Sequence, residues 1–319
     1  MFKKSFKYYK SRKPPPNLTQ VLDFLKSEDL LCDNKIKKVP LRMTNLDPFF
    51  GLKPLDTWEV YEIVAMPGLL FVKNPFTNLG QRYWTVRCLR DYTKRPNKSN
   101  LDPFNKPEDT KNWWDICQNG NKLLLDKMRW VTLGYHHNWD TKVYTENNRG
   151  QFPTDLKHMT EFLAKVLGFE QFSAQAAIVN FYHLNSTLSG HTDHSERNLN
   201  APLFSLSFGQ KAIFLIGGQQ LEDQAIPLFL HSGDILVMSK DSRLNYHGVP
   251  KILQGDVSEW SSPESESVPN EYDDVVKVCK DNSAWKPFGD YLKHSRINVN
   301  VRQVLFDGEI QLSEEINVF

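Results

Sequence analysis

The chain has 319 residues, with 39 Lys and Arg against 38 Asp and Glu, so its formal net charge is only +1. Its length predicts one large or two modest domains. Its 40% hydrophobic and 24% charged residues exclude a wholly disordered, collagen-like or coiled-coil chain. A charge this low excludes binding to nucleic acid or anionic membrane through a bulk positive field, so such a partner would need a local basic patch.

Two further absences narrow the class of protein. No segment approaches the ~20 consecutive apolar residues of a membrane-spanning helix. The four cysteines form no CxxC pair. This favours a reducing, intracellular compartment and disfavours a structural zinc cluster.

The first segment, residues 1–16, is a basic arm. Its first 13 residues carry six Lys or Arg and no acidic residue, and three prolines at 14–16 then end any helix. The pattern is compatible with a mitochondrial-type targeting segment, an arm that touches phosphate, or a solvated N-terminus. Nucleus, cytoplasm and mitochondrion therefore all stay open as locations.

Residues 17–124 are predicted to form an N-terminal extension of helices and loops. Helical stretches are expected at 18–31, 81–94 and 122–130, and a short apolar strand within 68–76. Residues 96–111, rich in Pro, Asn and Lys, predict a long loop.

Residues 125–306 read as a β-rich domain. After one helix at 155–169, short apolar strands follow from residue 174, joined by Gly-containing turns, which is typical of an antiparallel sandwich or barrel. Residues 256–274 hold seven carboxylates, two prolines and no Lys or Arg, and predict an inserted mobile loop. Residues 307–319 are expected to form a C-terminal tail.

Three side chains in this domain predict a metal site. His191 and Asp193 are two residues apart, so in an extended chain they share one face. We expect a second imidazole, from His247 across the barrel, to complete the set. Two histidines and one carboxylate are typical of non-haem Fe(II) oxygenases, because they hold the metal and leave positions open for co-substrate and oxygen.

The last predicted strand adds an anion site. Arg296, Asn298, Asn300 and Arg302 fall on one face, and the residues between them are apolar. Two buried guanidiniums require anions, and they suit bidentate recognition of carboxylates. A small dicarboxylic acid next to the metal, such as 2-oxoglutarate, would satisfy them.

In this order the motifs, preceded by Asn180-x-Tyr182, resemble the AlkB family of Fe(II)- and 2-oxoglutarate-dependent nucleic-acid dioxygenases over about residues 125–306. The strings SLSFGQKAIFLIGG and HSGDILVMS belong to the match. PGLLFVKNPF, MRWVTLGYHHNWD and SRLNYHGVP resemble the animal AlkB homologue one branch across nearly the whole chain. The resemblance implies an α+β fold with a β-rich core, a double-stranded β-helix (jelly roll) with helices packed outside and an N-terminal extension.

The resemblance also implies roles for single residues. Fe(II) would be ligated by His191, Asp193 and His247. 2-Oxoglutarate would be held by Asn180, Tyr182, Arg296, Asn298 and Arg302, with one arginine on each carboxylate. Asn300 stands where many AlkB proteins have Thr, and it keeps a hydrogen-bonding group beside the co-substrate. With O₂, and ascorbate as reductant in vitro, such an enzyme hydroxylates an N-methyl group and releases formaldehyde, succinate and CO₂.

A methylated base must be flipped or already unpaired to reach such a site. The resemblance places nucleotide recognition upstream of the metal motif, in a region that includes Trp114, Trp130, Tyr135, His136 and His137. Core packing and base stacking both stay open for Trp130. Bacterial-type relatives carry an acidic base contact two positions after the metal-binding aspartate. Here that position is Ser195, followed by Glu196, so a bacterial base preference is not expected.

The sequence leaves the target open. The candidates are 1-methyladenine or 5-methylcytosine in tRNA, and N6-methyladenine in unpaired or single-stranded DNA. A protein oxygenase acting on histone methyl-lysine and a catalytically silent nucleic-acid-binding scaffold are the alternatives, although the intact ligand set argues against the scaffold. A monomer is expected.

Overall fold

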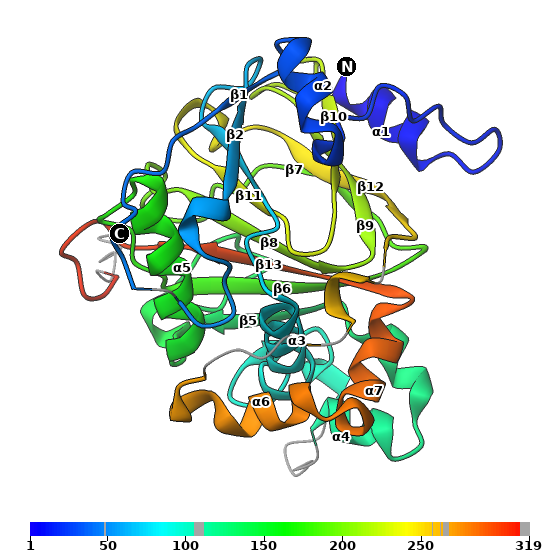
Figure 1. Cartoon of the computed structure of the whole chain (residues 1–319). Coiled ribbons are helices and arrows are strands. Elements are labelled where there is room, and N and C mark those ends of the chain that lie inside the picture. Colours follow the sequence, from blue (N-terminus) through cyan, green and yellow to red (C-terminus); the bar gives the residue numbers. More distant parts are fainter. Residues whose placement is uncertain (48, 105–111, 257, 262, 264–267, 313–319) are drawn as a thin grey trace, which may run out of the picture.

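The computed structural model describes residues 1–47, 49–104, 112–256, 258–261, 263 and 268–312. Two antiparallel sheets dominate it (Figure 1). The larger has nine strands in the order β1-β2-β3-β11-β8-β13-β6-β5-β4, and the smaller has four in the order β10-β9-β12-β7. The predicted jelly roll with helices outside is confirmed by this arrangement.

The strands of the larger sheet come from both halves of the chain: β1 (Ile36–Lys38), β2 (Glu59–Ile63), β3 (Leu69–Lys73), β4 (Lys98–Ser99), β5 (Trp130–Gly134), β6 (Ala176–His183), β8 (Leu203–Gly209), β11 (Ile235–Met238) and β13 (Ser295–Arg302). The smaller sheet contains β7 (Leu188–His191), β9 (Lys211–Ile216), β10 (Ile226–Leu230) and β12 (His247–Leu253). Because β3 pairs with β11, the segment predicted as an N-terminal extension is part of the main sheet.

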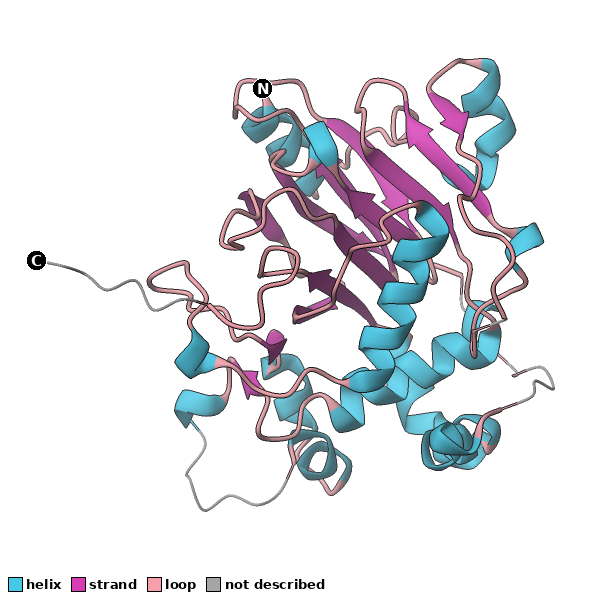
Figure 2. Ribbon diagram, turned by 90° about the vertical axis from the view of Figure 1, so that its left-hand side faces the viewer, coloured by secondary structure: helices cyan, strands magenta, loops and turns pink. Residues whose placement is uncertain are grey.

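Helices cover the outer faces of both sheets (Figure 2). They are α1 (Phe2–Lys10), α2 (Ser27–Cys32), α3 (Asn78–Val86), α4 (Trp113–Gln118), α5 (Thr154–Leu167), α6 (Asp273–Lys280) and α7 (Asn282–Leu292). The helix predicted at 155–169 is α5. The stretch predicted as helical at 81–94 is α3 followed by a π-helical turn, Arg87–Asp91. Residues 122–127 form a 3₁₀ helix instead of an α-helix.

The alternation of β13 decides which residues face the site. Ile297, Val299 and Val301 join the largest apolar core, which lies between the nine-stranded sheet and helices α3, α5 and α7. The polar residues of β13 therefore face the opposite way, toward the four-stranded sheet. A second apolar core fills the space between the two sheets.

The basic N-terminal arm folds as a helix on the outside of the smaller sheet. Phe2 and Tyr9 of α1 are buried with Ile213 and Leu215 of β9. The lysines of α1 are exposed on its other side. The arm is thus an amphipathic helix whose apolar side packs on the sheet.

The prediction of a mobile loop at 256–274 is corrected where the structure describes it. Trp260 and Tyr272 are 3% and 8% exposed and belong to the main core. The carbonyl of Trp260 accepts a hydrogen bond from Arg82, and the ring of Tyr272 stacks on Phe50. Residues 257, 262 and 264–267 lie outside the described residues, as do 105–111 of the predicted long loop and 313–319 of the tail. No helix in the described ranges is long and apolar enough to cross a membrane.

Candidate metal centre

Two of the three predicted ligands are neighbours in one sheet. His191 ends β7, His247 begins β12, and the two face each other in the antiparallel register. Their ring centroids are 4.4 Å apart. The expectation that His247 approaches from across the barrel is corrected, because the two histidines project from adjacent strands of the smaller sheet.

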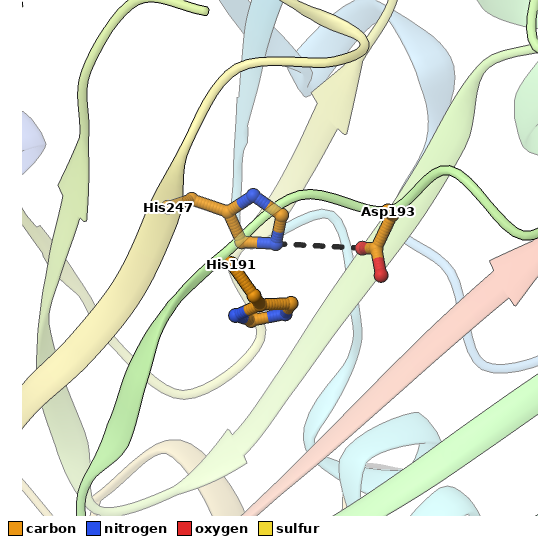
Figure 3. A group of neighbouring side chains, drawn as sticks. All are labelled: His191, Asp193 and His247. Atoms are coloured by element: carbon orange, nitrogen blue, oxygen red, sulfur yellow. Dashed lines mark ion pairs between the residues drawn. The ribbon is translucent and has the colours of Figure 1, made fainter. Parts of the chain in front are cut away.

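Asp193 follows β7 by two residues and completes the group. One ligand atom from each of His191, Asp193 and His247 lies within 4.8 Å of the others. Figure 3 shows the two imidazoles and the carboxylate converging on one small volume. The structure thus brings together the three residues that the sequence singled out.

Hydrogen bonds orient both imidazoles toward that volume. The Nδ1 of His191 lies 2.9 Å from the carbonyl of Ser189, and the Nδ1 of His247 lies 3.0 Å from the carbonyl of Asn245. A carbonyl can only accept, so each Nδ1 carries the proton and each Nε2 keeps a lone pair. Neutral imidazoles fixed in this way are the form that binds a metal. Burial, together with His247, lowers the pKa of His191 to about 4.

Asp193 supplies a charged oxygen that no described donor satisfies. Its Oδ1 accepts a hydrogen bond from Arg302 at 2.8 Å, but its buried Oδ2 accepts none. The Nε2 of His247 is 3.4 Å from this Oδ2. Burial alone would raise the pKa of Asp193, yet the charge of Arg302 holds it well below its usual range. An ionised, unsatisfied oxygen between two imidazole lone pairs fits a divalent cation such as Fe(II).

A cavity between the sheets is lined by the two histidines and by Arg296. Its lining includes Tyr182, Ser205, Leu230, Asn298 and Asn300. Arg296 is 1% exposed, and in the described chain its guanidinium reaches no carboxylate. It donates to Ser207 Oγ at 2.7 Å, and its Nε is unpaired. Burial lowers the pKa of Arg296 to about 10. This buried cation in the cavity wall fits the far carboxylate of 2-oxoglutarate.

Some of the other residues predicted to bind the co-substrate line the cavity, and others do not. Tyr182 lies opposite Arg296 in the register between β6 and β13 and lines the cavity, as do Asn298 and Asn300. Asn180 lies on the same strand but is not among the lining residues. Both terminal nitrogens of Arg302 are engaged by Asp193 and Glu196, and its buried Nε is the donor left without a partner. Arg302 therefore supports the metal ligand directly.

The four predicted substrate contacts between residues 130 and 137 divide into two pairs. Trp130 and His137 are half-buried, and both contact Trp139, whose ring centroid is 5.0 Å from that of Trp130 and 4.7 Å from that of His137. Burial and the charge of Arg302 lower the pKa of His137 to about 4, so this ring is within electrostatic range of Arg302. Tyr135 and His136 are buried, with Tyr135 bonded to Glu146 and His136 to Thr132.

Two of these expectations are corrected. Trp114 is 4% exposed and stacks on Phe288 of α7 inside the main core, so it does not reach the site. Glu196 is also buried, and both its oxygens are held by arginines, Arg243 and Arg302, so it does not present a carboxylate to a base. Ser195 is half-buried in the same loop.

Sequence reasoning missed three residues at the site. Tyr144 is 7% exposed, has an unpaired hydroxyl, and packs against His137 at 5.4 Å. Trp139 is 38% exposed, with the ammonium of Lys142 over its ring. Arg243 binds the backbone of Asp193. Trp139 and Tyr144 are near His137 in the chain, which was a weak available signal. Arg243 lies within the string SRLNYHGVP, but nothing in the sequence assigned it a role.

The geometry and a family comparison agree on the class of protein. The family model of the 2OG-Fe(II) oxygenase superfamily matches residues 68–302. That range contains the three metal ligands and the arginines of β13. The chain is an Fe(II)- and 2-oxoglutarate-dependent dioxygenase, which uses O₂ as its second substrate.

Similar proteins narrow the class further. The chain is 36% identical to "Nucleic acid dioxygenase ALKBH1" of Homo sapiens over 333 residues, which cover 95% of this chain and 84% of that relative. It is 34% identical to "tRNA demethylase abh1" of Schizosaccharomyces pombe, and the match covers 77% of this chain and 82% of that relative. It is 27% identical to "DNA N(6)-methyladenine demethylase ALKBH1A" of Arabidopsis thaliana, covering 92% and 90%. The chain belongs to the AlkB family, and within it to the branch of these ALKBH1 proteins.

Proposed function

We propose that this dioxygenase oxidatively demethylates a methylated base in unpaired nucleic acid, either tRNA or DNA. Bound Fe(II), with 2-oxoglutarate and O₂, supplies an oxidant for the C–H bond of an N-methyl group, and formaldehyde, succinate and CO₂ leave. The protein's own part is to hold the co-substrate at Arg296, to exclude water between the sheets, and to position the base.

The observation that carries the proposal is an aromatic wall formed by Trp130, His137, Trp139 and Tyr144. Two of its members, His137 and Tyr144, are close enough to Asp193 and Arg302 to interact with their charges. Successive ring centroids are 4.7 to 5.4 Å apart. The Nδ1 of His137 and the hydroxyl of Tyr144 have no partner in the described chain. Flat rings stack on bases of any sequence, and unpaired polar atoms among them suit hydrogen bonds to a base edge.

A second support is a line of positive charge that leads to this wall. Arg12, just after α1, donates to Asn185 at 2.9 Å, and Arg129 donates to the next residue, Ser186, at 3.2 Å. Trp130 follows Arg129 directly. The exposed lysines of α1 continue the line on the far side. Because the net charge is only +1, such a local line is what a phosphate backbone requires.

The relatives' names point the same way, since they include a tRNA demethylase and a DNA N6-methyladenine demethylase. The test is a mass-spectrometric nucleoside assay with Fe(II), ascorbate and 2-oxoglutarate, on total tRNA and on bubble DNA containing N6-methyladenine. We expect one methylated nucleoside to decrease with the wild type and to persist with Asp193→Ala. Succinate formation without loss of any nucleoside would contradict the proposal and favour a methyl-lysine protein substrate.

The basic line is tested by a matched pair of variants. Lys7 and Lys10 end α1, and Lys277 and Lys280 end α6, which lies on the opposite side of the molecule (Figure 1). Changing Lys7 and Lys10 to Gln should weaken nucleic-acid binding and flatten its dependence on salt by about one phosphate contact or more. The same change at Lys277 and Lys280 should leave both unaltered. Equal effects from the two pairs would refute a specific path.

A further inference from the structure

Four buried charged residues form a network of ion pairs that includes one metal ligand, Asp193. Asp193, Glu196, Arg243 and Arg302 are each between 2% and 7% exposed. Arg302 binds Asp193 and Glu196, each at 2.8 Å, and Arg243 binds the second oxygen of Glu196 at 3.0 Å. The two positive and two negative charges balance, which reduces the cost of burying them.

The ion pairing within this network is unusual in one respect. An arginine beside a carboxylate commonly forms a bidentate fork, with two parallel N–H···O bonds. Arg302 instead spreads its two terminal nitrogens over two different carboxylates. A fork between Arg302 and Asp193, with a second between Arg243 and Glu196, would also satisfy all four charges. That alternative would occupy both oxygens of Asp193.

The observed pairing leaves Oδ2 of Asp193 without a hydrogen bond from any described residue, beside the Nε2 of His247. Arg243 reinforces it from the other side. Its Nη1 donates to the backbone carbonyl of Asp193 at 2.7 Å, and its Nε donates to the carbonyl of Ala201 at 2.9 Å. Arg243 thus fixes the loop that carries both Asp193 and Glu196.

We infer that Glu196, fixed by Arg243, is a positioning residue that draws one arm of Arg302 away from Asp193 and so keeps Oδ2 free to bind the metal. Without the charge on Glu196, Arg302 closes a fork on Asp193 and competes with the cation. The role concerns metal affinity, so it does not depend on which substrate the enzyme oxidises.

The test measures Mn(II) binding to the purified apo-protein by calorimetry, without co-substrate or turnover. Glu196→Gln keeps the shape of the side chain but removes its charge, and we expect the dissociation constant for Mn(II) to rise by about tenfold or more. An unchanged dissociation constant would overturn the inference.

A second background separates competition from general damage. Lysine has a single ammonium and cannot form a guanidinium fork. In a chain carrying Arg302→Lys, adding Glu196→Gln should therefore change Mn(II) affinity much less than it does beside Arg302. An equal loss in both backgrounds would show that Glu196 acts only by stabilising the fold, and would overturn the inference.

Glu196→Asp covers the case in which the glutamine variant does not fold. It retains the charge balance but is one methylene too short to reach both arginines. Circular dichroism should show a folded protein, and the Mn(II) dissociation constant should rise in the same direction. Wild-type affinity in the folded aspartate variant would count against the inference.

Discussion

Arg296 should lower the free energy of unfolding of the apo-protein and should provide much of its affinity for 2-oxoglutarate. Burial lowers its pKa from 12.5 to about 10. The guanidinium is charged in the folded and the unfolded chain at neutral pH, so this shift is a penalty on folding at every pH below about 10. At about 1.4 kcal/mol per pKa unit it amounts to roughly 3 kcal/mol.

Replacing Arg296 by Met removes that penalty and loses the hydrogen bond to Ser207, a loss of about 1 kcal/mol. The apo-protein should therefore melt about 2 to 4 °C higher. The affinity for 2-oxoglutarate should fall by about 100-fold or more, because two charge-assisted hydrogen bonds contribute roughly 3 kcal/mol or more.

The assay combines thermal unfolding of the apo-protein with calorimetric titration of 2-oxoglutarate in the presence of Mn(II). Arg82→Met is the matched control. Arg82 is also buried, at 3% exposed, but its guanidinium donates hydrogen bonds to the carbonyls of Trp260 and Cys279. That variant should lose stability and keep its co-substrate affinity. A destabilised Arg296→Met protein with unchanged affinity for 2-oxoglutarate would refute the reasoning.

Three further outcomes are expected. Trp114→Ala should lower the free energy of unfolding by about 3 to 5 kcal/mol, because its ring is core, while affinity of the folded protein for nucleic acid stays the same; weaker binding in titrations would restore it as a substrate contact. Deleting 256–274 should lower the melting temperature, since Trp260 and Tyr272 are lost from the core, and Trp260→Ala should reproduce part of the effect; an unchanged melting temperature would mean that the segment is dispensable. The third outcome concerns pH: burial lowers the pKa of His136 to about 4, so between pH 6.5 and 4 the unfolded state binds more protons and stability declines as pH falls. Denaturant titrations of His136→Gln should show a shallower decline than the wild type, and identical slopes would contradict the assignment.

Sequence periodicity predicts much of the site, because several of its residues lie on regular strands. The alternation along 296–302 correctly separates the face of the two arginines from the apolar face, and β13 keeps that alternation over its full length. The metal motif is similarly local, since two of its members are two residues apart. The pattern of β13 survives folding because the pleat of a strand dictates it, and His191 and Asp193 stay close because only one residue separates them.

The failures have tertiary causes. β7 and β10 carry only weak sequence signals, because β7 is short and half-exposed and β10 contains a proline at an edge. Without β7, the direct pairing of His191 with His247 could not be foreseen. Sequence alone does not distinguish a tryptophan in a core from one on a binding surface, which is why the prediction for Trp114 was wrong. The burial of Glu196 depends on Arg243 and Arg302, which are distant in the chain.

The central claim is that His191, Asp193 and His247 hold Fe(II) beside a 2-oxoglutarate whose far end pairs with Arg296. The most direct measurement is an anaerobic titration of the apo-protein with Fe(II) and 2-oxoglutarate, followed by visible absorption. We predict a weak metal-to-ligand charge-transfer band in the wild type, its loss in Asp193→Ala, and its appearance in Arg296→Met only at much higher 2-oxoglutarate. Absence of the band in the folded wild-type protein, or its persistence in Asp193→Ala, would contradict the account.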